Sequence, residues 1–192
     1  MNLDFSAIMS RVMRVFRYDL TVFQEVEEDQ AATQQAWAVV VLAAVASGIG
    51  SALGSLISGG GFVGMLLGLI VTPILALIGY FLWAFVTYWV GVNMFQGETD
   101  FEEMQRVIGF AYAPNVLGLL GFIPCVGFLI SLAASLYALV LSVMAVKEGL
   151  DVDMGKAIVT CLIGWAVNFI LVSVVGGLAL GAAIGVSVLT SQ

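Results

Sequence analysis

The sequence predicts an all-α membrane protein with five transmembrane helices and an amphipathic N-terminal helix at the membrane surface. Of its 192 residues, 61% are hydrophobic and 10% are charged, whereas soluble domains have about 45–50% apolar and about 25% charged residues. The charged residues are confined to three short blocks separated by long apolar segments. Because the basic residues are few and histidine is absent, we expect no nucleic-acid partner, metal or cofactor.

The first charged block, residues 1–30, is expected to be a cytoplasmic amphipathic helix followed by an acidic linker. Apolar residues recur every three or four positions over residues 3–26, and Arg11, Arg14 and Arg17 fall on the opposite side of the helical wheel. Such a helix binds flat on anionic headgroups, where each arginine contributes on the order of 1 kcal/mol. The alternative is a helix that packs on the protein's own cytoplasmic face. The acidic linker residues are expected to be solvated.

The membrane domain is expected to cover residues 31–192, with its first two spans at about 36–58 and 73–95. The first span is uncharged and long enough to cross about 30 Å of hydrocarbon at about 1.5 Å per residue. The second lies in the longer uncharged run 62–95. Two spans and a turn need more than about 40 residues. We therefore predict a single span preceded by a glycine-rich extension.

The third, fourth and fifth spans are predicted at about 107–122, 125–146 and 157–187. A Gly-Phe-Ile-Pro turn separates the third from the fourth, and the two form a helical hairpin whose first arm is kinked at Pro114. A re-entrant hairpin that does not reach the far face is the alternative. The charged block 147–156 precedes the fifth span.

The distribution of positive charge predicts the orientation of this domain. With five spans, all six basic residues lie on one side of the membrane, whereas two crossings by residues 62–95 would divide them three against three. Basic residues concentrate on the cytoplasmic side, so we place the N-terminus in the cytoplasm and the C-terminus outside. No charged residue falls within a predicted span, which argues against a proton-coupled transporter.

Three stripes of glycines at four-residue spacing are expected to pack helices together. Small residues let helix backbones approach closely in lipid, and all three stripes lie in the predicted outer half of the membrane. We expect the first, second and fifth spans to meet there, with self-association through a stripe as the alternative. The packing residues are Gly50, Gly54, Gly60, Gly64, Gly68, Gly177, Gly181 and Gly185.

A few polar residues near the third span have expected structural roles. Thr99 or Asp100 is expected to cap a short helix that leads into this span. Asn115 follows Pro114 and is expected to satisfy backbone groups that the kink leaves free. Asn168, in the fifth span, is expected to bond across helices.

The segment Thr99–Glu103, the Gly-Phe-Ala-Tyr-Ala-Pro run at 109–114 and the connector Lys147–Lys156 together resemble the Yip family, over roughly residues 20–188. These are multi-pass membrane proteins named for interaction with Ypt/Rab GTPases. The resemblance implies a membrane adaptor or organiser, not an enzyme. The special region that it implies comprises Arg106, Gly109, Phe110, Tyr112, Pro114 and Asn115.

The N-terminal region lacks the Asp-Leu-Tyr-Gly-Pro motif of eukaryotic members. The chain is therefore similar to compact prokaryotic members, which implies the prokaryotic cytoplasmic membrane, and GTPase binding is not carried over. The expected partners are the lipid bilayer, a membrane or cytoplasmic protein, and a second copy of the chain in a homo-oligomer. The alternative function is a small-solute channel or facilitator, lined by Asn115 in the span that Pro114 breaks.

Overall fold

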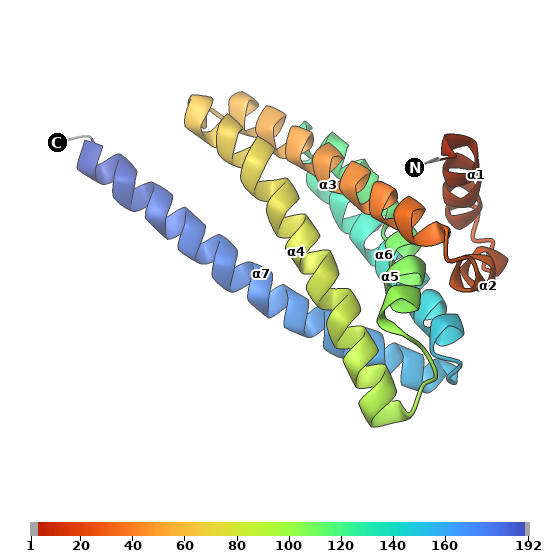
Figure 1. The fold of residues 1–192 in the computed structure, drawn as a ribbon. Coiled ribbons are helices and arrows are strands. Elements are labelled where there is room, and N and C mark those ends of the chain that lie inside the picture. Colours follow the sequence, from red (N-terminus) through yellow and green to blue (C-terminus); the bar gives the residue numbers. More distant parts are fainter. Residues whose placement is uncertain (1–3, 191–192) are drawn as a thin grey trace.

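The computed structural model describes residues 4–190, apart from the side chains of residues 171, 172, 175, 176 and 178–190. Every regular element of the described residues is a helix (Figure 1), which confirms the all-helical fold class. The elements are α1 (Phe5–Phe16), α2 (Thr21–Glu28), α3 (Ala32–Ile57), α4 (Gly61–Phe95), α5 (Phe101–Ala111), the 3-10 helix η1 (Ala113–Phe122), α6 (Val126–Gly149) and α7 (Met154–Thr190).

Three of the described helices are long and apolar enough to cross a membrane, namely α3, α4 and α6. The 3-10 helix η1 and the segment Met154–Ile170 of α7 are shorter apolar helices. At 1.5 Å per residue, α3 is about 39 Å long and α4 about 53 Å long, and the hydrocarbon core is about 30 Å thick. The chain is thus a multi-pass integral membrane protein.

The uncharged run 62–95 lies in one continuous helix, α4, although Pro73 is inside it. The predicted glycine-rich extension is itself helical, since α4 begins at Gly61 and not near Pro73. A proline removes one backbone hydrogen bond from a helix and its ring needs space. Gly48 of α3 provides that space, because a Cβ on Gly48 would lie 2.8 Å from Pro73 Cδ.

The prediction of one amphipathic helix over residues 3–26 is wrong, because the chain turns between α1 and α2. Tyr18 has a left-handed backbone with a φ of 61°. The Asp19 carboxylate accepts hydrogen bonds from Thr21 N at 3.2 Å and Thr21 Oγ1 at 2.7 Å, which starts the second helix. This reversal brings the acidic residues of α2 back toward the arginines of α1.

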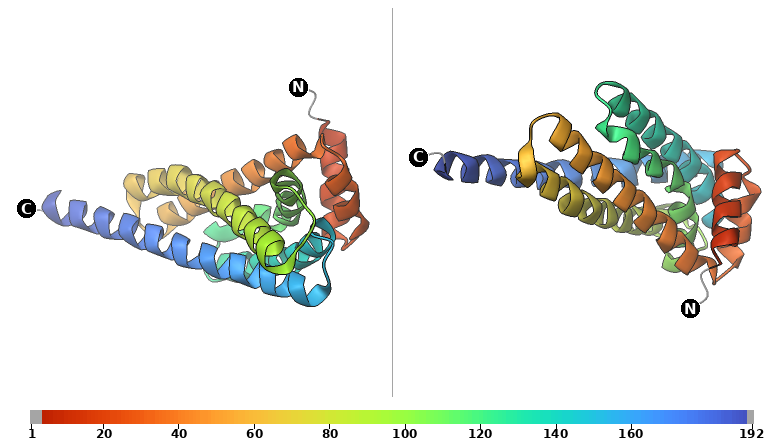
Figure 2. Two further views of the ribbon diagram at one scale, coloured as in Figure 1. Left: turned by 60° about the horizontal axis from the view of Figure 1, so that its bottom comes forward. Right: turned by 90° about the horizontal axis from the view of Figure 1, so that it is seen from above.

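The helices α1 and α2 lie at one end of the bundle, against α5 (Figures 1 and 2). We call α1, α2 and α5 the cap. The α3–α4 turn and the η1–α6 turn lie away from it, and α7 crosses α4 near the cap and then diverges from it (Figures 1 and 2). Most of the largest fully buried side chains belong to the cap or contact it, among them Phe23, Tyr80 and Phe110. Far from the cap, Phe62 and Phe128 are more than 65% exposed, as lipid-facing residues are.

The three glycine stripes differ in the element against which they pack. Gly68 brings α4 against α3, because a Cβ there would lie 2.6 Å from Ala52 N. Gly60 and Gly64 face Ser55 of α3. The stripe that begins at Gly50 contacts η1 and not α4: Gly50 faces the Gly118 carbonyl, and Gly54 faces Phe122.

The third stripe does not repeat this packing at its first member. No atom lies within 4 Å of the place where a Cβ on Gly177 would stand, so the described part of the chain gives this glycine no packing partner. The predicted meeting of the first, second and fifth spans is therefore not seen at Gly177. Gly181 and Gly185 lie outside the residues whose side chains are described.

Candidate functional site

Arg106 is the residue that joins α5 to α2. Its side chain is 3% exposed. It donates from Nε to the Val26 carbonyl at 3.1 Å, from Nη2 to the Glu27 carbonyl at 2.8 Å and from Nη1 to Thr33 Oγ1 at 3.2 Å. These carbonyls belong to the last turn of α2, where the helix dipole favours a positive charge. Arg106 therefore holds the cap together and is not exposed to a partner.

The start of α5 is set by a capping box. The Asp100 carboxylate accepts from Glu103 N at 2.8 Å, and the Glu103 carboxylate accepts from Asp100 N at 3.0 Å. This confirms the predicted cap and assigns it to Asp100. Further along, a Cβ on Gly109 would lie 2.8 Å from Ala36 Cβ, so the glycine lets α5 lie against α3. Phe110 is fully buried.

At the end of α5 the helix changes from α to 3-10 geometry. Pro114 stands in the first turn of η1, where its missing N–H is tolerated. Asn115 Nδ2 donates to the Tyr112 carbonyl at 3.1 Å, and Asn115 N donates to the same oxygen at 3.0 Å. This is the role expected for Asn115 beside the kink. Its amide oxygen stays available for another group.

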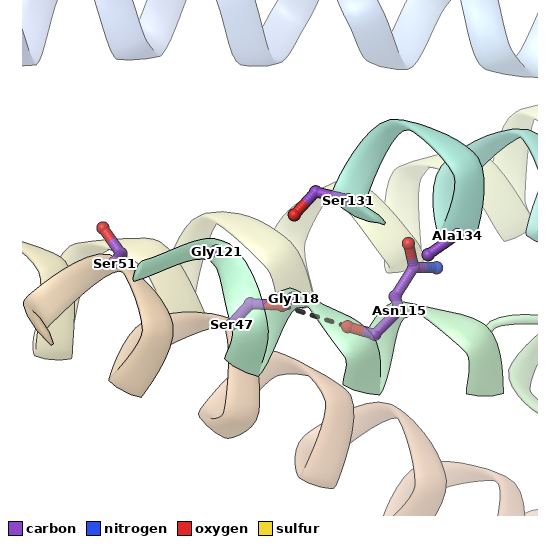
Figure 3. Close-up of a pocket in the computed structure, with 7 residues that line it drawn as sticks. All are labelled: Ser47, Ser51, Asn115, Gly118, Gly121, Ser131 and Ala134. Atoms are coloured by element: carbon purple, nitrogen blue, oxygen red, sulfur yellow. Dashed lines mark hydrogen bonds between the residues drawn. The ribbon is translucent and has the colours of Figure 1, made fainter. Parts of the chain in front are cut away.

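A polar cavity of about 350 Å³ lies beside Asn115, between α3, η1 and α6 (Figure 3). We call it the Asn115 cavity. In Figure 3 the Ser131 hydroxyl and the Asn115 amide point into the space between η1 and α6, and Ser47 Oγ donates to the Asn115 carbonyl at 3.3 Å. The residues that line it are Ser47, Ser51, Asn115, Gly118, Gly121, Ser131 and Ala134.

Sequence reasoning found Asn115 but missed the serines around it. The available signal was their spacing: Ser47 and Ser51 are four residues apart on α3, and Ser131 and Ser135 are four apart on α6. Side chains at this spacing share one face of a helix. None of the seven lining residues is charged, so the Asn115 cavity is suited to uncharged, hydrogen-bonding groups.

Asn168 does not make the expected bond across helices through its amide oxygen. Asn168 Oδ1 is buried and has no hydrogen-bond partner among the described residues. The same is true of Trp83 Nε1 on the facing helix α4. Both side chains line a smaller cavity of about 110 Å³ that also reaches Asn115. Asn115 therefore belongs to two cavities.

The arginines of α1 have partners inside the cap. Arg11 pairs with Glu25 at 2.9 Å and Asp29 at 2.7 Å, and Arg14 pairs with Asp19 at 2.8 Å and with Glu25. These ion pairs correspond to the alternative of a helix packed on the protein itself, while Glu25 and Glu28 remain exposed, as expected of solvated linker acids. Arg17 makes no ion pair with any described residue.

These pairs and the surrounding acids shift the acidity of the cap carboxyls in opposite directions. Hydrogen bonds from Arg14 and Arg11 lower the pKa of Glu25, and a hydrogen bond from Arg11 lowers the pKa of Asp29. Burial, reinforced by Asp151 and other nearby carboxylates, raises the pKa of Glu27 to about 7. The cap thus contains one carboxyl that titrates near neutral pH.

The described residues contain no group of three or more His, Cys, Asp or Glu side chains that could hold a metal ion. Cys125 is exposed and Cys161 is buried, and both are free. The polar groups that the structure brings together inside the bundle are hydroxyls, amides and an indole N–H. Such groups bind and orient a neutral ligand by hydrogen bonds.

The Yip1 domain family matches residues 13–176 of the chain. No curated protein and no solved structure matches it. The matched range covers most of the chain and includes the capping box, the Arg106 contacts and the Asn115 cavity. The resemblance inferred from the connectors is therefore confirmed, and this multi-pass membrane protein belongs to the Yip1 domain family.

Proposed function

We propose that the protein is a non-enzymatic membrane adaptor whose cap recruits a protein partner at the cytoplasmic surface. The observation that carries this proposal is the network of polar contacts that fixes α1 and α2 on α5 at one end of the bundle. Two ion-paired helices are bound to α5 by the buried guanidinium of Arg106. Exposed charged residues, including Glu28 and Glu102, remain on its surface. A rigid, charged surface at a membrane is suited to protein recognition.

The proposed topology has five spans, namely α3, α4, residues 107–122 at the end of α5 and in η1, α6 and α7, with the N-terminus in the cytoplasm. The last five residues of α5 and the 10 of η1 reach about 28 Å at about 1.5 and 2.0 Å per residue, close to the roughly 30 Å of the hydrocarbon core, which supports a third crossing broken at Pro114. Four of the six basic residues lie in the cap or directly after α1, and the other two lie in the last turn of α6 and the first turn of α7. This distribution agrees with the positive-inside rule.

In the same proposal α1 lies at the membrane interface. Phe5, Met9 and Met13 recur every four residues and are 44–70% exposed. Met9 and Met13 also line an apolar groove of about 270 Å³ that reaches Leu42 of α3. Lipid chains are suited to cover such a face. Arg17 is then the residue proposed to contact the headgroups.

Site-specific photo-crosslinking in the native membrane tests the adaptor role. A photoreactive amino acid is placed at Glu28 or Glu102 on the cap, and at Phe128 far from the cap as the matched control. We expect the two cap positions to capture the same foreign protein and Phe128 not to capture it, as identified by mass spectrometry. Capture of lipid alone from both cap positions would contradict the proposal.

The second candidate function is a small-solute facilitator, and the Asn115 cavity is the observation that favours it. An uncharged, open pocket of about 350 Å³ between α3, η1 and α6 can admit a small neutral solute. If the protein conducts such solutes, proteoliposomes are more permeable to glycerol or urea than protein-free liposomes, and Ser131→Leu, which fills the cavity, removes the difference. Asn93→Leu, on the surface of α4, is the control. Equal permeability with and without protein would exclude this candidate.

A further inference from the structure

We propose that the groove between α1, α3 and η1 binds one phospholipid with an anionic headgroup, whose acyl chain lies in the groove and whose headgroup contacts Arg17. The inference rests on the proposed placement of α1 at the membrane interface and names the lipid that this surface selects. We call the site the α1 groove. It has a volume of about 270 Å³ and is lined by residues of all three helices, among them Met9 and Met13 of α1, Leu42 of α3 and Val116 of η1.

The lining of the α1 groove is suited to a hydrocarbon chain. All nine residues that line it are apolar. Leu42 is 55% exposed and Val116 is 37% exposed, so the groove opens onto the sides of α3 and η1 that face lipid in the proposed topology. Met9 and Met13 belong to the wall that α1 contributes. Methionine is unbranched and flexible, and these two side chains can therefore adapt to an irregular acyl chain.

Arg17 supplies a positive charge that the protein itself leaves unpaired. It is exposed, and it is the one basic residue of the chain that makes no ion pair with a described residue. Arg11 and Arg14 are paired with carboxylates of the cap. A guanidinium matches the geometry of a phosphate group. An anionic phospholipid therefore offers Arg17 the partner that the described residues do not.

The charge of Arg17 stands at one end of the α1 groove. Arg17 directly follows Phe16, which lines the groove, and its backbone N donates to the Met13 carbonyl at 3.1 Å. It thus continues the helical turn, and side chains four residues apart share one face of a helix. Tyr137 of α6 holds this turn on the bundle, because its hydroxyl donates to the Val15 carbonyl at 3.2 Å.

The two ends of α1 differ in charge, and this difference orients the lipid. At the N-terminal end, Asp4 is the one charged side chain among residues 4–10, and its carboxylate would repel an anionic headgroup. At the C-terminal end, the Asp19 carboxylate is already occupied, since it pairs with Arg14 at 2.8 Å and accepts from Thr21 N at 3.2 Å. The headgroup therefore lies at Arg17, and the chain runs from there along the groove.

Native mass spectrometry of the purified full-length protein in detergent tests the proposal. The probes are anionic dioleoylphosphatidylglycerol and zwitterionic dioleoylphosphatidylcholine, supplied in equal amounts. We expect the first bound lipid to be the anionic one about five times as often as the zwitterionic one, the preference that one arginine confers. Arg17→Gln should remove this preference. The matched control Lys156→Gln removes the same charge at an exposed position of α7 and should keep it.

A second variant tests the place of the acyl chain. Met9→Ser combined with Met13→Ser makes the α1 wall of the groove polar, and both side chains are exposed, so the buried core is left intact. We expect this double variant to lose the first bound lipid at concentrations that saturate the wild type. If it does not fold, Leu42→Trp, which fills the groove from α3, serves instead. In detergent without lipid, Arg17→Gln should unfold at the wild-type temperature.

Three results would overturn the proposal. One is an absence of preference for the anionic lipid in the wild type, and another is an equal preference in Arg17→Gln. The third is retention of the lipid by the groove variants, since the chain would then lie elsewhere. Equal binding of both lipids that is lost in the groove variants would overturn the selective site but not the placement of α1 at the interface. The purified protein contains no partner, so failure here leaves the adaptor role intact.

Discussion

The cap and the cavity region around Asn115 differ in whether their buried polar groups have hydrogen-bond partners. In the cap, the guanidinium of Arg106 donates to three oxygens, and Arg11 donates to two carboxylates and an amide. Around Asn115 the polar side chains are uncharged, and Trp83 Nε1 and Asn168 Oδ1 have no partner among the described residues. The comparison separates a region whose buried polar groups are paired from one in which several buried polar atoms have no partner among the described residues.

The largest expected effect is a loss of stability on removing the buried guanidinium of the cap. Arg106→Met leaves the carbonyls of Val26 and Glu27 without their donor, and each buried unsatisfied group costs about 1–3 kcal/mol. We expect the free energy of unfolding, measured by denaturant titration in detergent, to fall by about 3 kcal/mol. The control Arg17→Met should change it by less than about 0.5 kcal/mol, because Arg17 makes no ion pair with a described residue. Equal effects would contradict the role of Arg106.

The next effect concerns the close contact of α3 and α4. Gly68→Ala places a methyl group 2.6 Å from Ala52 N, so the backbones must separate, and overpacking costs about 1–3 kcal/mol. Thermal unfolding should show a lower Tm for this variant. Gly177→Ala adds the same methyl group where no other described group lies within 4 Å, and alanine favours a helix by up to about 1 kcal/mol. A loss of stability at Gly177 as well would point to a packing partner from a second copy.

A smaller effect is expected at the start of α5. Asp100→Ala removes the capping box, whose loss costs about 1 kcal/mol. Because Arg106 lies on the same helix, the change should also loosen α2. Hydrogen exchange measured by mass spectrometry should therefore rise in both α5 and α2. An increase confined to residues 99–103 would show that the cap does not unfold as a unit.

The smallest effect is the pH dependence of Glu27. Burial first, and then nearby carboxylates, raise its pKa to about 7 from an ordinary 4.5, so ionisation destabilises the folded state. This penalty is absent below pH 4.5, grows as the pH rises to 7 and is complete above pH 7. Glu27→Gln should raise stability at pH 8 by about 1 kcal/mol or less, after allowance for solvent screening, and should be neutral near pH 4.5.

The control for this last prediction is Glu28→Gln, which changes an exposed neighbour. Comparing Tm at pH 8 and pH 5 for both variants isolates the contribution of burial at Glu27. A gain at Glu27 that is equal at the two pH values would mean that charge is not its cause. Arg11 and Arg14 act in the other direction, since they lower the pKa of Glu25 and Asp29 and stabilise the ionised carboxylates.

Features that depend on short stretches of sequence were predicted well. Hydropathy predicted the apolar helices, because a membrane-crossing segment must satisfy its own backbone. The pattern around Asp100 predicted a helix start, because a capping box closes within four residues. The same reasoning placed Asn115 beside the Pro114 kink. The prediction of a single helix over residues 3–26 failed, because apolar residues continue to recur every three or four positions through the turn at Tyr18.

The sequence by itself determined that this chain is a multi-pass, all-helical membrane protein of the Yip1 domain family with its basic residues confined to three short charged blocks. Only the tertiary structure decided that Arg106 is buried against α2, that Arg11 and Arg14 are paired within the cap, and that Trp83 and Asn168 share one cavity. Helical periodicity specifies which residues share a face of one helix. It does not specify which faces meet, and these contacts join residues far apart in the sequence.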